Sequence, residues 1–203
     1  MKIAFVCGLA GRNCWVARLN SLSAHEYSSF LLPDIISEKG TLISSFIDDL
    51  HKYDVIVLHS MSSYLLSFSE LHKFCPILFD PNLDVADQSL ISNIERIDTD
   101  TYKQKILQNI FVNSPCVCGK CRKKINSREL ACYMILAKKI CEEQFSSVMS
   151  DAISKNKLRI LRSRDGQIPS SFENTITDTG LNHNAMLDNP LRFEKQLEKL
   201  LTT

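Results

Sequence analysis

The feature that most constrains the fold is an apolar run that ends abruptly at a serine. Residues 55–58 read Val-Ile-Val-Leu, and His59, Ser60 and Met61 follow them directly. A short apolar run rich in β-branched residues favours a strand that is buried on both faces, as strands of parallel sheets are. The sequence therefore predicts that Ser60 stands at the carboxyl end of a central strand, where the chain turns into a helix.

The residues around Ser60 resemble the Gly-x-Ser-x-Gly nucleophile elbow of the α/β-hydrolase family, in the variant Gly-His-Ser-Met-Gly-Gly. Leu58 and Ser62 stand where that motif has glycine. In the family the serine hydroxyl is the nucleophile, and the next backbone N–H helps to form the oxyanion hole. The resemblance thus implies these roles for Ser60 and Met61. The local pattern alone leaves open that Ser60 merely caps the following helix.

Two later segments follow in the family's chain order of nucleophile, acid and histidine. The strand-like run 157–161 leads to Asp165, and the loop 178–186 contains His183. The resemblance implies Asp165 as the acid and His183 as the base. Asp80 is the alternative acid, because it also follows an apolar strand-like run and some relatives place the acid one strand earlier.

The amino-terminal apolar run also ends in a glycine-containing loop. Cys7, Gly8 and Leu9 follow it, and Trp15 lies a few residues further on. This region resembles the family's His-Gly loop, with Cys7 in place of the usual histidine. The resemblance implies that Leu9 supplies the second oxyanion N–H and that Gly8 shapes the loop. Trp15 and Gly8 are also candidates to line the substrate site.

The remaining histidines are given no catalytic role. Side chains of neighbouring strand residues point to opposite faces, so His59 is predicted to pack or to support the site and not to act as a second base. His25, His51 and His72 lie on polar or helical stretches and are interpreted as ordinary surface residues. Their spacing suggests no metal site, and no cofactor is predicted.

The fold class predicted from this resemblance is α/β, with a mostly parallel central sheet, helices on both faces and an inserted helical lid. Residues 1–83 and 155–203 would form the core, and residues 84–154 the lid. A chain of 203 residues with 44% hydrophobic residues can bury one sizeable core. In the family, such a lid covers the active site and shapes the substrate pocket.

The predicted lid contains three cysteines close together, Cys116, Cys118 and Cys121. With Cys132 or Cys141 as a fourth ligand, a zinc site is conceivable, but the spacing lacks the paired Cys-x2-Cys units typical of zinc sites. A disulfide is the second alternative, for an exported or redox-regulated protein. The favoured interpretation is reduced thiols, some of them buried as small apolar groups.

The charge and hydropathy of the chain limit the classes of partner that it is expected to bind. The formal net charge of +1 gives no overall reason to expect nucleic acid, and no apolar run is long enough to span a membrane. The apolar start of the chain is interpreted as a strand and not as an export signal, which predicts a cytoplasmic protein. A basic run in the lid favours a solvated turn; the alternative is that it steers an acidic acyl carrier protein. Its residues are Lys120, Arg122, Lys123 and Lys124.

The function implied by the resemblance is hydrolysis of an ester or thioester of a small acyl substrate through an acyl-enzyme intermediate. Carboxylesterases, thioesterases and the pimeloyl-carrier methyl ester esterases of biotin synthesis are similar small enzymes with lids, so a carrier-linked acyl ester is a candidate substrate. Two alternatives stay open: a binding or regulatory module that has lost catalysis, and an acyltransferase that uses an alcohol or amine in place of water.

Overall fold

The computed structural model describes residues 1–8, 13–81, 128–129, 131–132, 134–136, 151, 158–164, 166 and 176–202. Several predictions from the sequence fall outside these residues. They concern Leu9, Asp165, most of the proposed lid with its basic run, and the cysteines at 116, 118, 121 and 141. The domain boundaries at 83 and 155 likewise stay a prediction.

Six parallel strands form one sheet in the order β2-β1-β3-β4-β5-β6. In chain order the strands are β1 (Lys2–Val6), β2 (Glu26–Phe30), β3 (Val55–His59), β4 (Ile77–Phe79), β5 (Arg159–Arg162) and β6 (Ile176–Asp178). The chain adds β2 to one side of β1 and then returns to place β3 on the other side. The strand order therefore reverses between β1 and β3, which is where open α/β sheets bind ligands.

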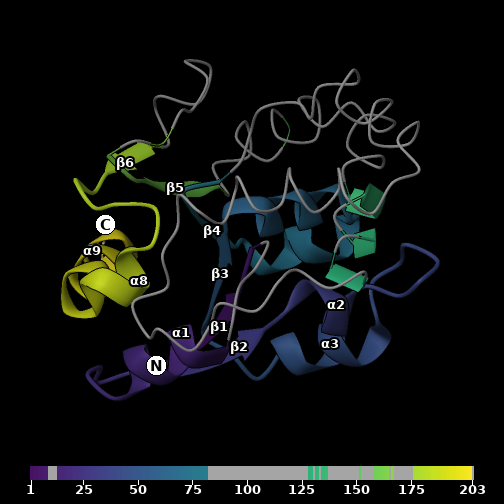
Figure 1. Cartoon of the computed structure of the whole chain (residues 1–203), viewed down its shortest axis with the longest axis horizontal. Helices are drawn as coiled ribbons and strands as arrows, with labels where there is room; N and C mark the ends of the chain where they lie inside the picture. Colours follow the sequence, from purple (N-terminus) through teal and green to yellow (C-terminus); the bar gives the residue numbers. More distant parts are fainter. Residues whose placement is uncertain are drawn as a thin grey trace, which may run out of the picture.

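Helices cover both faces of the sheet, as Figure 1 shows. One face carries α1 (Asn13–Asn20), α8 (Ala185–Asp188) and α9 (Pro190–Thr202), and the other carries α2 (Leu32–Ile35) and α3 (Ser44–Leu50). Each face has its own cluster of buried apolar side chains, so the sheet is buried on both sides. The predicted α/β class, with a parallel sheet and helices on both faces, is confirmed.

The sequence predicts a helix after Ser60, and the structure has two 3₁₀-helices there, η1 (Ser60–Ser67) and η2 (Ser69–Phe74). Serine side chains explain the tighter winding. Ser62 Oγ donates to the His59 carbonyl at 2.9 Å, and Ser67 Oγ donates to the Tyr64 carbonyl at 2.9 Å. Such bonds to the carbonyl three residues back compete with the i−4 ladder of an α-helix.

A short part of the predicted lid region belongs to the core. The described residues between 128 and 136 are helical, and Cys132 and Leu136 join the buried cluster beside α2 and α3. Arg128 donates to the Pro33 carbonyl at 2.6 Å, which fixes this helix against α2. Cys75 and Cys132 carry free thiols, and burial raises the pKa of Cys132.

The amino-terminal apolar run forms β1, an inner strand of the sheet that pairs with both β2 and β3. Its interpretation as a strand is therefore confirmed. Within the described part of the chain, no helix has the length and apolar character needed to cross a bilayer. The cytoplasmic location stays a prediction.

Candidate active site

Two candidate catalytic residues stand at the carboxyl ends of neighbouring strands. Strands β3 and β4 pair in register from Val57 opposite Ile77 to His59 opposite Phe79. Ser60 and Asp80 are each the first residue beyond that pairing, so they leave the sheet side by side. Both have a positive φ, 55° for Ser60 and 43° for Asp80, so both strands end in a sharp turn.

The backbone of Ser60 has the strained geometry of a nucleophile elbow. A positive φ at a residue other than glycine costs about 1–3 kcal/mol and persists only where the surrounding structure imposes it. Ser60 is half-buried, and Met61 behind it is buried. The alternative role as a helix cap is not what the structure shows, because η1 begins at Ser60 itself and its N-cap residue, His59, makes no side-chain capping bond.

Gly8 lies against this elbow. A Cβ atom at Gly8 would stand 2.7 Å from the His59 carbonyl oxygen, 2.9 Å from Ser60 Cβ and 3.2 Å from the Met61 nitrogen. Two of these neighbours are backbone atoms that cannot move aside without distorting the turn. Only glycine therefore allows the loop after β1 to approach Ser60 and the N–H of Met61 so closely.

The two positions that depart from the glycine motif are accommodated by other means. Leu58 is fully buried in the cluster on the α2 and α3 face, packed as an ordinary strand side chain. Ser62 is also fully buried, and besides its bond to the His59 carbonyl its Oγ lies 2.9 Å from the Val6 carbonyl oxygen. Ser62 thus ties the turn after β3 to the end of β1, and its small side chain allows the close approach that glycine provides in the motif.

His183 is paired with Asp80. The Nδ1 atom of His183 and the Oδ2 atom of Asp80 are hydrogen-bonded, although the two residues are far apart in sequence. Asp80 is only 7% exposed, while the side chain of His183 is 41% exposed. A buried carboxylate that faces a solvent-accessible imidazole is the arrangement that orients a catalytic histidine.

The surroundings of Asp80 favour its ionised form. Burial acts to raise the pKa of Asp80, but the hydrogen bond and charge of His183 and the hydrogen bond from Ser163 outweigh it, so the pKa is lowered. The Ser163 N–H donates to Asp80 Oδ1 at 3.2 Å. Gly166 also lies against the carboxylate, since a Cβ there would be 2.1 Å from Asp80 Oδ1. The loop after β5 therefore donates a hydrogen bond to the Asp80 carboxylate and packs its backbone closely against it.

The structure thus brings Asp80, which the sequence offered as the alternative acid, into contact with His183. Asp165, which the sequence placed first, lies outside the described residues. The sequence did not identify the supporting contacts of Ser163 and Gly166. No sequence motif marks either residue. Ser163 acts through its backbone N–H, which every residue except proline has, and Gly166 acts through the absence of a side chain.

His59 lies beneath His183. Its Nε2 donates to the main-chain carbonyl of His183 at 3.0 Å, and the two ring centroids are 4.7 Å apart. His59 is 1% exposed and packs among aromatic side chains, so burial first and the charge of His183 second lower its pKa to about 3. His59 is therefore a neutral, buried residue with a positioning contact, as the alternation of strand side chains predicted.

Trp15, a sequence candidate for the substrate site, is buried in the structure. Its indole ring packs edge-on against the His59 ring, with the centroids 5.7 Å apart. Phe5 and Phe79 complete the aromatic surroundings of His59. Trp15 therefore contacts the candidate site through His59.

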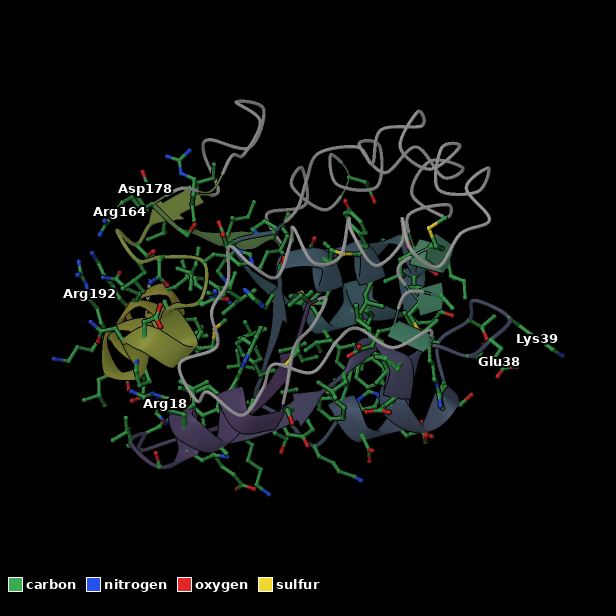
Figure 2. The ribbon with its side chains drawn as sticks, in the orientation of Figure 1. Arg18, Glu38, Lys39, Arg164, Asp178 and Arg192 are labelled. Atoms are coloured by element: carbon green, nitrogen blue, oxygen red, sulfur yellow. The ribbon has the colours of Figure 1, made fainter. Side chains whose placement is uncertain are left out.

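A pocket of about 250 Å³ opens beside the loop that carries His183. Figure 2 shows the side chains of Arg164 and Arg192 on the same side of the molecule, and both line this pocket. The guanidinium of Arg164 donates to the Gly180 carbonyl at 3.3 Å. The full lining is Arg164, Gly180, Leu181, Asn182, Ala185, Asp188, Asn189 and Arg192. Two arginines with one carboxylate make the pocket suitable for an anionic group.

Comparisons with known proteins are sparse. No protein-family model matches the chain, and no curated protein matches it. Among solved structures, the chain is similar to a candidate lipase from Acinetobacter baumannii, with 14% sequence identity, coverage of 99% of this chain and 84% of that one, and a TM-score of 0.41. At this distance the likeness carries no argument about activity, and the interpretation of the site depends on its own geometry.

Proposed function

We propose that the chain is a serine hydrolase that cleaves an ester or thioester, with Ser60 as nucleophile, His183 as base and Asp80 as acid. The observation that carries the proposal is the hydrogen bond between the buried Asp80 and the solvent-accessible His183 at the carboxyl end of the sheet, next to a serine with φ 55° at the end of the adjacent strand. The site also lies at the reversal of strand order, where ligands bind in open α/β sheets.

We assign a role to each ring nitrogen of His183 on the basis of its contact with Asp80. Asp80 accepts the hydrogen bond from His183 Nδ1, so the neutral imidazole carries its proton there. Nε2 is then the atom that can accept the Ser60 proton as the oxygen attacks the carbonyl carbon. Asp80 stabilises the resulting imidazolium, which next donates its proton to the leaving alcohol or thiol. Water attacks the acyl-enzyme by the same route and releases Ser60.

The oxyanion formed in each attack needs donors that are already in position. The N–H of Met61 follows the nucleophile directly and lies on the side that Gly8 approaches. We assign it as one donor, and the N–H of Leu9 as the second, on the resemblance alone. A donor of this kind is typically worth about 3 kcal/mol of transition-state stabilisation.

The substrate is proposed to be a small acyl ester or thioester with an anionic group, and a carrier-linked acyl ester is one such substrate. Arg164 and Arg192 support this class, because both line the pocket next to the His183 loop. The basic run at 120–124 would add to the positive electrostatic potential of these arginines. Its role stays a prediction. The choice between water and another acceptor, and hence between hydrolase and acyltransferase, belongs to the same proposal and is decided by product analysis.

Turnover of short p-nitrophenyl esters tests the proposal. Wild-type protein is expected to show saturable hydrolysis, and Ser60→Ala is expected to lose it while its circular dichroism spectrum and thermal unfolding stay the same. Ser69→Ala is the matched control, since Ser69 is an exposed serine on η2 whose hydroxyl contacts Glu70. Retained turnover in Ser60→Ala would overturn the assignment. A folded wild-type protein without turnover would favour the binding-module alternative.

A further inference from the structure

A second cluster of polar side chains joins the amino-terminal end of β2 to α9. His25 directly precedes β2, and Glu194 and Glu198 lie one helical turn apart on α9. One ligand atom from each of these residues lies within 4.8 Å of the others. His25 Nε2 is 2.9 Å from Glu198 Oε1 and 4.0 Å from Glu194 Oε1. Three atoms of metal-binding type therefore converge on one small volume.

The spacing of these atoms is compatible with a shared metal ion. Zinc bonds to histidine nitrogen and carboxylate oxygen are about 2.0–2.1 Å long, so a tetrahedral site holds its ligand atoms roughly 3.3 Å apart. His25 Nε2 lies 2.9 Å from the Glu198 oxygen and 4.0 Å from the Glu194 oxygen, on either side of that value. All three ligand atoms lie within 4.8 Å of one another, so the side chains would need to shift to hold one ion at equal distances.

A buried hydroxyl nearby has no hydrogen-bond partner in the described part of the chain. It is Tyr27 Oη, on a side chain that is 3% exposed. Tyr27 is the second residue after His25, so in the extended chain both side chains project to the same face, and Tyr27 packs in the apolar cluster that α9 also joins. A buried polar atom without a partner is costly, and an ion or a water bound to an ion would satisfy it.

The charge balance of the cluster also favours a cation. The side chain of Glu194 is only 10% exposed, and among the described residues its ion-pair partner is His25 at the long distance of 4.0 Å. Ser23 Oγ also contacts the Glu194 carboxylate and in addition accepts the His25 N–H at 2.8 Å. A hydroxyl that holds a ligating carboxylate in place is typical of the outer shell of metal sites. One imidazole cannot neutralise two carboxylates.

We propose that His25, Glu194 and Glu198 bind a zinc ion, with the Tyr27 hydroxyl facing the same site. One imidazole and two carboxylates are ligands that zinc accepts, with a fourth position open to water. The site lies at the amino ends of the parallel strands, at the opposite edge of the sheet from Ser60. It is therefore separate from the candidate active site and does not depend on the proposed hydrolase activity.

The sequence predicts no metal here and treats His25 as an ordinary surface residue. The structure gives a reason for that difference, because the glutamates are about 170 positions further along the chain and meet His25 only once α9 has packed against α1. The metal would hold two distant parts of the chain together. It would tie the carboxyl-terminal helix, whose apolar side packs into the cluster that α1 also joins, to the strand edge (Figure 1).

Metal content and thermal unfolding of tag-free protein test the proposal. The protein is stripped with EDTA, incubated with excess zinc sulfate, dialysed, and measured by inductively coupled plasma mass spectrometry. The wild type is expected to retain one more equivalent of zinc than His25→Gln or Glu198→Gln, and zinc is expected to raise its Tm. In EDTA, Glu198→Gln is expected to unfold close to the wild type, because the Glu198 side chain is exposed.

Two controls separate this site from other ligands. A triple variant with serine at the positions of Cys116, Cys118 and Cys121 is expected to keep the His25-dependent equivalent, and His51→Gln is expected to bind zinc as the wild type does. Zinc binding that is the same in wild type, His25→Gln and Glu198→Gln would overturn the proposal, and so would the absence of zinc binding. A Tm that rises equally in all the proteins would also contradict it.

Discussion

His59 Nε2 donates a hydrogen bond to the main-chain carbonyl of His183 at 3.0 Å, so the residue before the proposed nucleophile holds the loop of the proposed base. A carbonyl oxygen can only accept, which places a proton on Nε2 of His59. The ring is 1% exposed and stays neutral because burial lowers its pKa to about 3. One buried contact thus links the residue before Ser60 to the main chain of His183.

The neutrality of His59 predicts acid-sensitive stability. The folded-state pKa of about 3 lies below the ordinary value of 6.5. As the pH falls below 6.5, His59 is therefore protonated in the unfolded chain but stays neutral in the folded protein. Stability is therefore expected to fall by on the order of 2 kcal/mol between about pH 7 and about pH 4.5. Urea unfolding at both pH values measures this change.

His59→Phe is the matched variant for that measurement, because it keeps an aromatic ring and removes the titrating group. Its stability is expected to change less between the same two pH values. The lowered pKa of Asp80 contributes stability that is lost only at more acidic pH, as pH falls through its folded-state value. An equal decrease in wild type and His59→Phe would show that another group carries the pH dependence.

The identity of the acid is a second prediction. Asp80→Asn is expected to lower kcat about 10⁴-fold, because the amide no longer holds His183 in the required tautomer or stabilises its cation. Asp165→Asn is the comparison, and its kcat is expected to stay near the wild-type value. Steady-state kinetics of one ester with all three proteins measures both. A large loss in Asp165→Asn with an active Asp80→Asn would reverse the assignment.

The close approach of Gly8 gives a third prediction. Gly8→Ala places a Cβ within 3 Å of the His59 carbonyl and of Ser60 Cβ, so the elbow must shift. Displacement of the nucleophile is expected to lower kcat/KM by about 10- to 100-fold. Gly40→Ala is the control, since Gly40 has φ +76° far from the site. It is expected to lower stability by about 1–2 kcal/mol, because alanine disfavours this positive φ, without changing kcat/KM of the folded enzyme. Equal activity in both variants would argue against the role of Gly8.

The arginines of the pocket give a fourth prediction. Arg192→Gln is expected to raise KM several-fold for an ester that carries a carboxylate on its acyl chain, and to leave KM unchanged for a neutral ester of equal length. Arg18→Gln on α1, a residue that does not line the pocket, is the control with the same change of charge. Equal effects on the two esters, or from the two variants, would mean that the pocket does not recognise the anionic group.

The sequence predicted the parallel sheet and the position of Ser60 because both depend on local pattern. The run before Ser60 is apolar and β-branched, and the turn that follows needs only small residues. The pairing of His183 was harder to predict. Asp80 and Asp165 both follow an apolar strand-like run, and the contact depends on where the loop after β6 crosses the sheet edge.

Other features depended on packing that leaves no local signal. The serines after residue 60 fit a helix pattern, and their bonds to nearby carbonyls give 3₁₀ geometry instead. Leu58 departs from the glycine motif in sequence, but its side chain packs in the apolar cluster on the sheet face that α2 and α3 cover. His25 has no metal pattern in sequence because its partners belong to α9. Residue type alone could not bring these groups together.

The most direct test of the central claim is intact-mass spectrometry after treatment with a fluorophosphonate probe. These probes phosphonylate a serine only when a base and an oxyanion site activate it. The account predicts a single adduct on the wild type that is absent from Ser60→Ala and retained by the control Ser69→Ala. A folded wild-type protein without an adduct, or an adduct that persists in Ser60→Ala, would contradict it.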